Sequence, residues 1–247
     1  MTKRKKYLLF YLFFFMVLLA FFYWALSEEK PFNESKLAVI NAQIPSYSFL
    51  DQNGSPFTNS KTEGKVHVVE YFFTTCKGIC PKMNTNMRRV HDRFKDEPDF
   101  MILSHTCMPE TDSVALMKAY EQKMLSGDLK EQPDGSYKMI FPDSTGENPA
   151  IKNSHWFFLT GDKAKLYDLA RHGYMIDNGK TDSTQQISDQ FIHTQFFALV
   201  DKYGRVRGVY DGLIEKEIQK LINDIPELIS EKVQPARFLN GFSNDPK

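Results

Sequence analysis

Cysteine is scarce in this chain. Its 247 residues include only three cysteines, which excludes a small scaffold held together by several disulfides. Neither sign of charge is in excess, because 31 Lys and Arg balance 31 Asp and Glu. This composition does not indicate nucleic-acid binding. The sequence has no internal repeat and no glycine pattern of a phosphate-binding or dinucleotide-binding loop. Its 21 Phe and 11 Tyr instead predict an ordinary hydrophobic core.

The N-terminus combines a basic cluster with a long uncharged segment. Residues 3–6 are all Lys or Arg, and residues 7–26 contain no charged side chain and are rich in Phe and Leu. A helix of this length crosses a bilayer core of about 30 Å, and its basic flank stays on the cytoplasmic side. We therefore predict a single-pass membrane anchor with residues 1–6 in the cytoplasm. A cleaved signal peptide is the alternative.

Beyond the anchor, the sequence predicts a linker at 27–38, one domain at 39–232 and a flexible tail at 233–247. This part of the chain is mildly acidic, because removing the four basic residues of the tip leaves 27 Lys and Arg against 31 Asp and Glu. Residues 126–154 are rich in Gly, Pro, Asp and Asn. They are predicted to be an inserted loop with a small hairpin around Asp134-Gly135.

Strand-like and helix-like segments alternate along this domain. Two β-rich segments in its last third, joined by a turn at 201–204, predict a β-hairpin within 195–210. We expect Asp112 to start one helix and Asp162 to cap another. The alternation predicts a thioredoxin-like α/β sandwich, with a central mixed sheet and flanking helices. Strands are expected at 65–73, 99–104 and 156–159, and helices at 82–94, 112–124, 162–171 and 214–229.

Two of the three cysteines, Cys76 and Cys80, lie where the strand at 65–73 turns into the helix at 82–94. Thiols with three residues between them can face one point in space, where they close a disulfide or bind one soft metal ion. The thioredoxin redox motif has two intervening residues instead of three, which favours metal binding over redox chemistry. A purely structural disulfide is a further interpretation of the pair.

His193 is the third candidate ligand. It precedes the strand-like segment 196–200, and in a thioredoxin-like fold the loop before that strand packs beside the cysteine pair. Adding an imidazole to two thiolates lets one site hold both Cu(I) and Cu(II). A loop histidine without a ligand role is the alternative interpretation of His193.

Cys107 is the odd thiol. Its neighbours His105 and Met108 suggest a second metal site. A lone cysteine is more often a small buried hydrophobic residue, and we interpret Cys107 in that way.

Four stretches of this sequence resemble the Sco/SenC family of copper chaperones. They are VEYFFTTCKGICP at 69–81, residues 110–120, WFFLTG at 156–161 and residues 193–208. The resemblance implies a membrane-anchored thioredoxin-like domain that faces the bacterial periplasm or, equivalently, the mitochondrial intermembrane space. It also implies that Cys76, Cys80 and His193 bind one copper ion, and that the protein helps to assemble the dinuclear copper centre of cytochrome c oxidase. Its expected partner is the copper subunit of that oxidase or another copper protein.

Two departures from the family pattern leave other functions open. Lys77-Gly78 stands where the family usually has Pro-Asp, and Met108-Pro109-Glu110 stands where it has Asp-Pro-Glu. A nearby ammonium group lowers the pKa of a thiol and makes it more reactive. The alternative function is therefore a thiol–disulfide oxidoreductase with Cys76 and Cys80 as the catalytic pair, one attacking and one resolving. A redox or copper sensor that only binds and signals is a third hypothesis.

Overall fold

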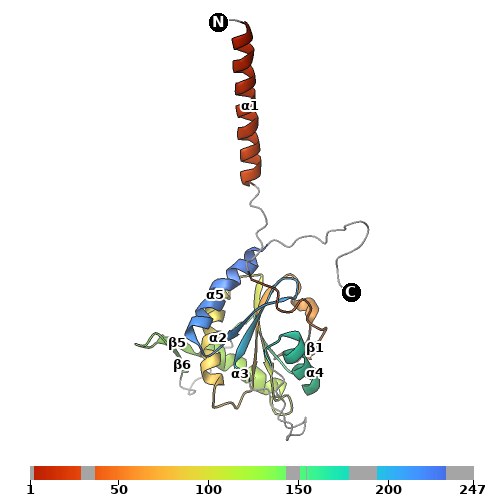
Figure 1. The fold of residues 1–247 in the computed structure, drawn as a ribbon. Helices are drawn as coiled ribbons and strands as arrows, with labels where there is room; N and C mark the ends of the chain where they lie inside the picture. The colour runs from red at the N-terminus through yellow and green to blue at the C-terminus, as the bar shows by residue number, and fades with distance from the viewer. Residues whose placement is uncertain (1–2, 29–36, 143–150, 154, 178–193, 232–247) are drawn as a thin grey trace. The chain divides into compact units, whose positions relative to one another are not determined.

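The computed structural model describes residues 3–28, 37–142, 151–153, 155–177 and 194–231 (Figure 1). The chain divides into two compact units, of which the larger spans Lys36–Ile229 and the smaller contains helix α1 (Lys3–Glu28). Helix α1 includes the uncharged residues 7–26. Among the described residues, no helix combines the length and the apolar character that crossing a membrane requires. The predicted tail at 233–247 lies outside the described residues.

A five-stranded sheet with the order β7-β4-β3-β8-β9 forms the centre of the larger unit. Strands β7, β4 and β3 run parallel to one another, and β8 pairs antiparallel with both β3 and β9. The predicted mixed sheet is therefore confirmed, with β3 as its central strand. The strands are β3 (Val66–Phe72), β4 (Phe100–Thr106), β7 (Trp156–Leu159), β8 (Phe196–Val200) and β9 (Val206–Asp211).

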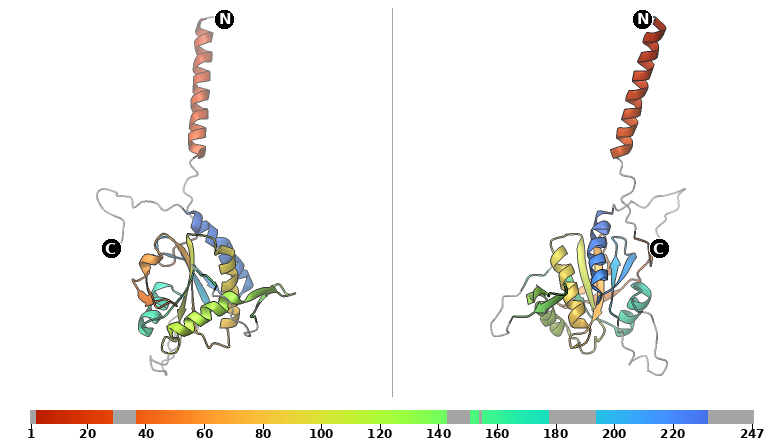
Figure 2. Two further views of the ribbon diagram at one scale, coloured as in Figure 1. Left: turned by 180° about the vertical axis from the view of Figure 1, so that it is seen from behind. Right: turned by 60° about the vertical axis from the view of Figure 1, so that its left-hand side comes forward.

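Alternating side chains of β3 pack into two separate hydrophobic cores. Val68 and Phe72 pack under helices α2, α3 and α5 on one face of the sheet. Val69 and Tyr71 point to the other face, which the β1–β2 hairpin and α4 cover; the two layers are visible in Figures 1 and 2. The covering elements are α2 (Cys80–Phe94), α3 (Val114–Ser126), α5 (Glu215–Ser230), β1 (Ser48–Leu50), β2 (Pro56–Thr58) and α4 (Lys163–Asp168). The short 3-10 helix η1 (Asn59–Lys61) follows β2 and has no buried residue.

The helix boundaries differ by up to three residues from those that the sequence predicts, and the differences in α3 and α4 have identifiable causes. Helix α3 does not begin at Asp112, because Ser113 is its N-cap and the Ser113 Oγ accepts a hydrogen bond from the Leu116 N–H at 3.3 Å. Asp162 caps α4 as predicted, with its Oδ1 accepting from the Lys165 N–H at 2.9 Å. That α-helix ends early, however, and its continuation is a π-helix, η2 (Leu169–Gly173).

A second hairpin lies within the predicted insertion at 126–154. It pairs β5 (Asp128–Glu131) with β6 (Tyr137–Ile140). Gly135 in its turn has φ +79°, a conformation that glycine adopts without strain. The hairpin is attached to helix α2, because the Arg89 guanidinium lies 4.1 Å from the centroid of the Tyr137 ring.

The adjoining Arg88 of α2 secures the end of helix α3. Its Nη1 donates hydrogen bonds to the carbonyl oxygens of Met124 at 2.6 Å, Leu125 at 2.7 Å and Gly127 at 3.0 Å. These carbonyls lie at the end of α3, where the helix itself leaves them without partners. Helices α2 and α3 and the β5–β6 hairpin therefore form one connected assembly.

Candidate thiol and metal site

The cysteine pair lies at the turn from the central strand into helix α2. Strand β3 ends at Phe72, the Cys76 N–H donates to the Phe73 carbonyl at 3.2 Å, and α2 begins at Cys80. Pro81 occupies the first turn of the helix, where its missing N–H costs nothing. The structure thus places both predicted thiols at one end of the sheet.

The two thiols differ in exposure and in protonation. Both are free cysteines, but Cys76 is half-buried while Cys80 is only 5% exposed. Burial raises the pKa of the Cys80 thiol, and its hydrogen bond with the Cys76 side chain raises this pKa further. A hydrogen bond with the Phe73 backbone lowers the pKa by a smaller amount. The dipole at the start of α2 favours a thiolate, yet the loss of water around Cys80 outweighs it. Cys76 is therefore the thiol that a partner can reach.

Asp112, which the sequence suggested only as a helix start, holds the cysteine loop in place. Its carboxylate accepts hydrogen bonds from the Thr74 hydroxyl at 2.5 Å, the Thr74 N–H at 3.2 Å and the Thr106 hydroxyl at 2.5 Å. Thr74 belongs to the loop that carries Cys76, and Thr106 ends strand β4. Asp112 is 1% exposed, so it ties two strand ends together from inside the protein.

Glu70 places a carboxyl group in the hydrophobic core beneath the site. It is fully buried, and its Oε1 accepts a hydrogen bond from the Ser104 hydroxyl at 2.6 Å, while Ser104 accepts one from the Trp156 indole at 2.8 Å. Its Oε2 has no hydrogen-bond partner among the described residues. Burial raises the pKa of Glu70 to about 7, against the smaller opposing effect of Ser104. The negative charge of Glu70 in turn contributes to the raised pKa of Cys80.

Cys107 is buried in the opposite core, as predicted for a small hydrophobic residue. It is 2% exposed, its N–H donates to the Phe72 carbonyl at 2.8 Å and its own carbonyl accepts from the Tyr167 hydroxyl at 2.9 Å. Burial raises the pKa of its thiol, and the nearby charges of Cys80 and Asp112 add to this. Cys107 therefore lies within electrostatic range of the pair but is shielded from solvent.

His193, the third predicted ligand, lies outside the described residues. No group of three or more His, Cys, Asp or Glu side chains arranged to hold a metal ion occurs in the described parts of the chain. The structure therefore brings Cys76 and Cys80 together and leaves the role of His193 as a prediction.

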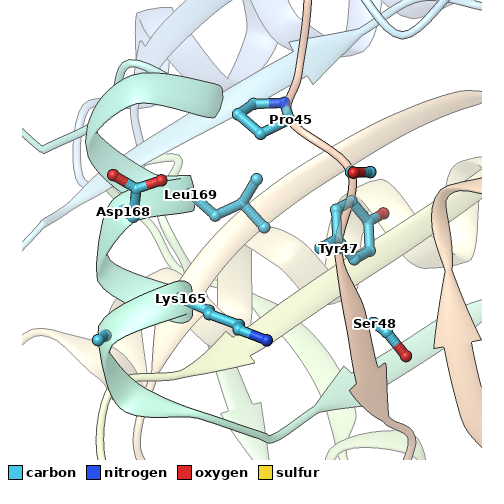
Figure 3. A pocket seen from close by; sticks show the side chains of 8 residues that line it. Pro45, Tyr47, Ser48, Lys165, Asp168 and Leu169 are labelled. Atoms are coloured by element: carbon cyan, nitrogen blue, oxygen red, sulfur yellow. The ribbon is translucent and has the colours of Figure 1, made fainter.

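A cavity of about 650 Å³ lies away from the cysteines. It is lined by residues 45–48 and by the α4–η2 segment. Figure 3 shows Leu169 pointing from that helical segment toward Pro45 and Tyr47. None of the described residues that line it is a cysteine or histidine. Its lining therefore offers none of the soft ligands that the cysteine pair provides.

Comparisons with known proteins relate this chain to one family. A family model described as SCO1/SenC matches residues 38–140. The chain is 24% identical over 188 residues to a SCO1 protein homolog of Bacillus subtilis, which covers 75% of this chain and 82% of that relative. A solved structure of a SCO1/SenC family lipoprotein from Bacillus anthracis is 25% identical, with a TM-score of 0.57, over 77% of this chain and 96% of that one. The chain is therefore similar to SCO1/SenC proteins over most of the domain that carries the cysteine pair.

Two further structures of Sco proteins confirm the thioredoxin-like α/β fold. BsSco, described as a cytochrome c oxidase assembly protein with a disulfide switch, is 22% identical with a TM-score of 0.56, over 79% of this chain and 98% of that one. ScoI of Bradyrhizobium japonicum, described with copper bound, is 19% identical with a TM-score of 0.50, over 74% and 98% of the two chains. At these identities the likeness shows the fold alone.

Removing the Asp112 carboxylate should loosen the cysteine loop. In Asp112→Ala the Thr74 and Thr106 donors lose their acceptor, so we expect the free energy of unfolding in urea to fall by about 2 kcal/mol. We also expect the Cys80 thiol to be alkylated faster, measured by mass spectrometry of trapped peptides. Glu110→Ala is the control, because the exposed Glu110–Lys163 ion pair should contribute less than about 1 kcal/mol. Equal stability and equal Cys80 reactivity in the two variants would contradict the role of Asp112.

Glu70 should make stability depend on pH. Its folded pKa of about 7 lies above its ordinary value of 4.5, so the folded state binds more protons than the unfolded state between these values. Its contribution is complete below about pH 4.5 and is lost as the pH rises through 7, by about 3 kcal/mol in all. Buried His67 and His105 have lowered pKa values and act in the opposite direction below pH 6.5.

The isosteric variant Glu70→Gln separates these effects. The difference in unfolding free energy between the wild type and Glu70→Gln, measured in urea from pH 4.5 to 8, removes the histidine contribution common to both. We expect the wild type to lose stability relative to the variant across this range. A constant difference would show that Glu70 does not titrate in the folded state within it.

Proposed function

We propose that this chain is a copper chaperone that binds one copper ion through Cys76, Cys80 and His193 and supports assembly of the dinuclear copper site of cytochrome c oxidase. The observation that carries the proposal is the pair of free thiols in mutual contact at the β3–α2 turn. The match of residues 38–140 to the SCO1/SenC family model supports it, as do the copper bound to Bradyrhizobium japonicum ScoI and the description of BsSco as an oxidase assembly protein. Copper is the cargo here, not a resident cofactor.

The two thiols have the chemistry that a copper carrier needs. Thiolates are soft ligands that select Cu(I), and each thiol gives up its proton when it binds the metal. Cys76 is half-buried and Cys80 is buried, so one ligand is accessible to an acceptor protein while the other holds the ion from inside. An arrangement with one accessible ligand suits transfer, because the acceptor can replace the accessible ligand first.

The strand that follows His193 supports its assignment as the third ligand. Thr194, the next residue, is 6% exposed and its hydroxyl donates to the Ile176 carbonyl at 2.6 Å. Strand β8 then starts at Phe196 and runs antiparallel to β3. The segment that enters β8 therefore reaches the same end of the sheet as the segment that leaves β3 for Cys76. In the proposal, the imidazole of His193 completes the site and stabilises Cu(II).

Membrane attachment is part of the proposal. Residues 7–26 carry no charge, lie within helix α1 and follow the basic residues 3–6. We assign them as the anchor, residues 27–38 as the linker and residues 39–232 as the working domain, on the periplasmic or intermembrane-space side. The Bacillus anthracis relative is described as a lipoprotein.

Thiol–disulfide exchange is the second candidate function, and the asymmetry of the pair favours it. An accessible Cys76 can attack a partner's disulfide, and a protected Cys80 can then resolve the mixed disulfide. The raised pKa of Cys80 is the opposite of what an attacking thiol needs, so the attacking role falls to Cys76. The disulfide switch described for BsSco is consistent with such a cycle.

Anaerobic copper titration of the reduced chain, with X-ray absorption on the loaded form, tests the first function. We expect one equivalent of Cu(I) bound through two sulfurs, with a nitrogen ligand added on oxidation to Cu(II). Cys76→Ser and Cys80→Ser should each abolish tight binding, and His193→Ala should weaken Cu(II) binding far more than Cu(I) binding. His172→Ala, at an exposed histidine paired with Asp168, is the control.

Two outcomes would change the proposal. Equal retention of Cu(I) and Cu(II) by His193→Ala would rule out His193 as a ligand. A chain that binds no stoichiometric copper but readily cycles a Cys76–Cys80 disulfide with a protein substrate would be an oxidoreductase instead.

Deleting residues 1–28 tests the anchor. The full chain should sediment with membranes and resist extraction by alkaline carbonate, and the deleted chain should be soluble. The double variant Leu18→Arg/Leu19→Arg, which places two charges within the same segment, should release the chain as well. A full chain that carbonate extracts completely would overturn the assignment.

A further inference from the structure

A surface cavity opens beside Cys76. It has a volume of about 320 Å³. Three parts of the fold line it: the Cys76 loop with the first turn of α2, the later turns of α3, and strand β6 with Phe141. The β5–β6 hairpin thus forms one wall of a groove that has the accessible thiol of the pair in its lining. We call it the Cys76 groove.

The floor of the Cys76 groove is apolar and fixed. Met124 and Met139 line it and are 3% and 9% exposed. Met139 lies against Gly127, where a Cβ atom would come within 2.5 Å of the Met139 Cγ, so only glycine leaves room for this packing. Phe141 also lines the groove and remains 38% exposed. These side chains offer an apolar surface of a size that suits one or two side chains of another molecule.

The rim of the groove is positively charged. Lys82, Lys123 and Lys138 line it and are exposed, and no Asp or Glu is among the described lining residues. The Lys123 Nζ lies 4.9 Å from the centroid of the Phe141 ring, so a cation adjoins the apolar surface directly. Asp134 at the hairpin turn interacts with the charge of Lys82 but does not line the groove. Complementarity therefore calls for an occupant with negative charge around an apolar side chain.

We propose that the Cys76 groove binds an extended segment of the acceptor protein, in which an apolar side chain flanked by Asp or Glu enters the groove and brings a neighbouring thiol of that protein to Cys76. The identity of the occupant as a thiol-bearing acceptor rests on the proposed function. The groove itself rests on the lining, the charge and the position of Cys76. The β5–β6 hairpin is then the element that selects the partner, and the cysteine pair carries out the chemistry.

A peptide with an activated disulfide tests this without copper. The probe is acetyl-Asp-Glu-Phe-Glu-Cys-Gly-amide, with its thiol joined to 5-thio-2-nitrobenzoate. The Cys76 thiolate attacks the peptide sulfur, the disulfide to thionitrobenzoate breaks, and thionitrobenzoate leaves as a coloured anion while Cys76 becomes disulfide-bonded to the peptide. Its release from the reduced full-length chain in a non-ionic detergent gives the rate. Matched peptides replace the acidic residues by Lys, or Phe by Gly.

We expect the acidic Phe peptide to react about tenfold faster than the Lys peptide at low salt, with the difference largely removed at 1 M salt, where the screening length is about 3 Å. The Gly peptide should also react about tenfold more slowly, because it buries no apolar side chain. Lys123→Glu/Lys138→Glu should reverse the charge preference. Lys130→Glu, an exposed lysine on the same hairpin outside the groove lining, should leave it unchanged.

A second pair of variants tests the apolar surface. Phe141→Ala should remove the preference for the Phe peptide over the Gly peptide. Ile140→Ala is its control, because Ile140 is adjacent and equally exposed at 39%, against 38% for Phe141, but does not line the groove. Equal rates for acidic and basic peptides in the wild type, or a charge preference that survives Lys123→Glu/Lys138→Glu, would overturn the proposal.

Two further measurements separate this proposal from the proposed function. The uncharged reagent 2,2′-dithiodipyridine reports the reactivity of Cys76 without a peptide, so each peptide rate is divided by the rate of this reagent with the same variant before the preferences are compared. If copper binds stoichiometrically but the peptide preference is absent, the groove proposal fails and the chaperone stands. If the preference is present but copper does not bind, the chaperone fails, and the groove serves a thiol–disulfide exchange partner.

Discussion

The pairing of strand β3 on both of its edges is the constraint on which the site depends. All seven residues of β3 pair in parallel with β4, and His67, Val68 and Val69 also pair antiparallel with β8. Every one of these residues is buried. The end of β3 is therefore fixed by its neighbours, and with it the start of the loop that carries Cys76. Because β8 runs the other way, the same pairing brings the segment that enters β8 to the cysteine end of the sheet.

The buried carboxylates of this fold differ in how many donors and charged groups surround them. Asp112 accepts hydrogen bonds from three donors, and Asp201 is ion-paired with the buried guanidinium of Arg207 at 2.8 Å. Glu70 accepts one hydrogen bond, from Ser104, and its pKa is correspondingly high. A carboxylate is stable in a core only when donors or charges replace the water it loses. Asp112 and Asp201 therefore stabilise the fold. The protonation of Glu70 makes the stability of the core beneath Cys80 depend on pH.

Local patterns in the sequence were enough to predict the elements and the cysteine pair. Apolar β-rich and helix-period runs predicted the strands and helices around the turn, and the Asp134-Gly135 pair predicted the inserted hairpin. Asp112 and Glu70 were missed because their partners are distant: Thr74 is 38 residues from Asp112, and Ser104 is 34 from Glu70. An aspartate just before a helix is also expected to be its N-cap, but Ser113 occupies that position in α3. A charged residue inside the β-rich run was the one signal for Glu70. His193 lies outside the described residues and stays a prediction.

The attachment of the β5–β6 hairpin to helix α2 has a consequence for how such a protein can diverge. Arg89 holds the hairpin through the ring of Tyr137, and Arg88 fixes the carbonyls that precede it. Its turn makes no comparable packing contact, because a side chain on Gly135 would meet no atom within 4 Å; the constraint there is the φ of +79°, which favours glycine. Insertions, and substitutions of turn residues other than Gly135, can accumulate without displacing the helix that carries Cys80. In the groove proposal, partner choice and the chemistry of the cysteine pair are thus open to selection as separate traits of one domain.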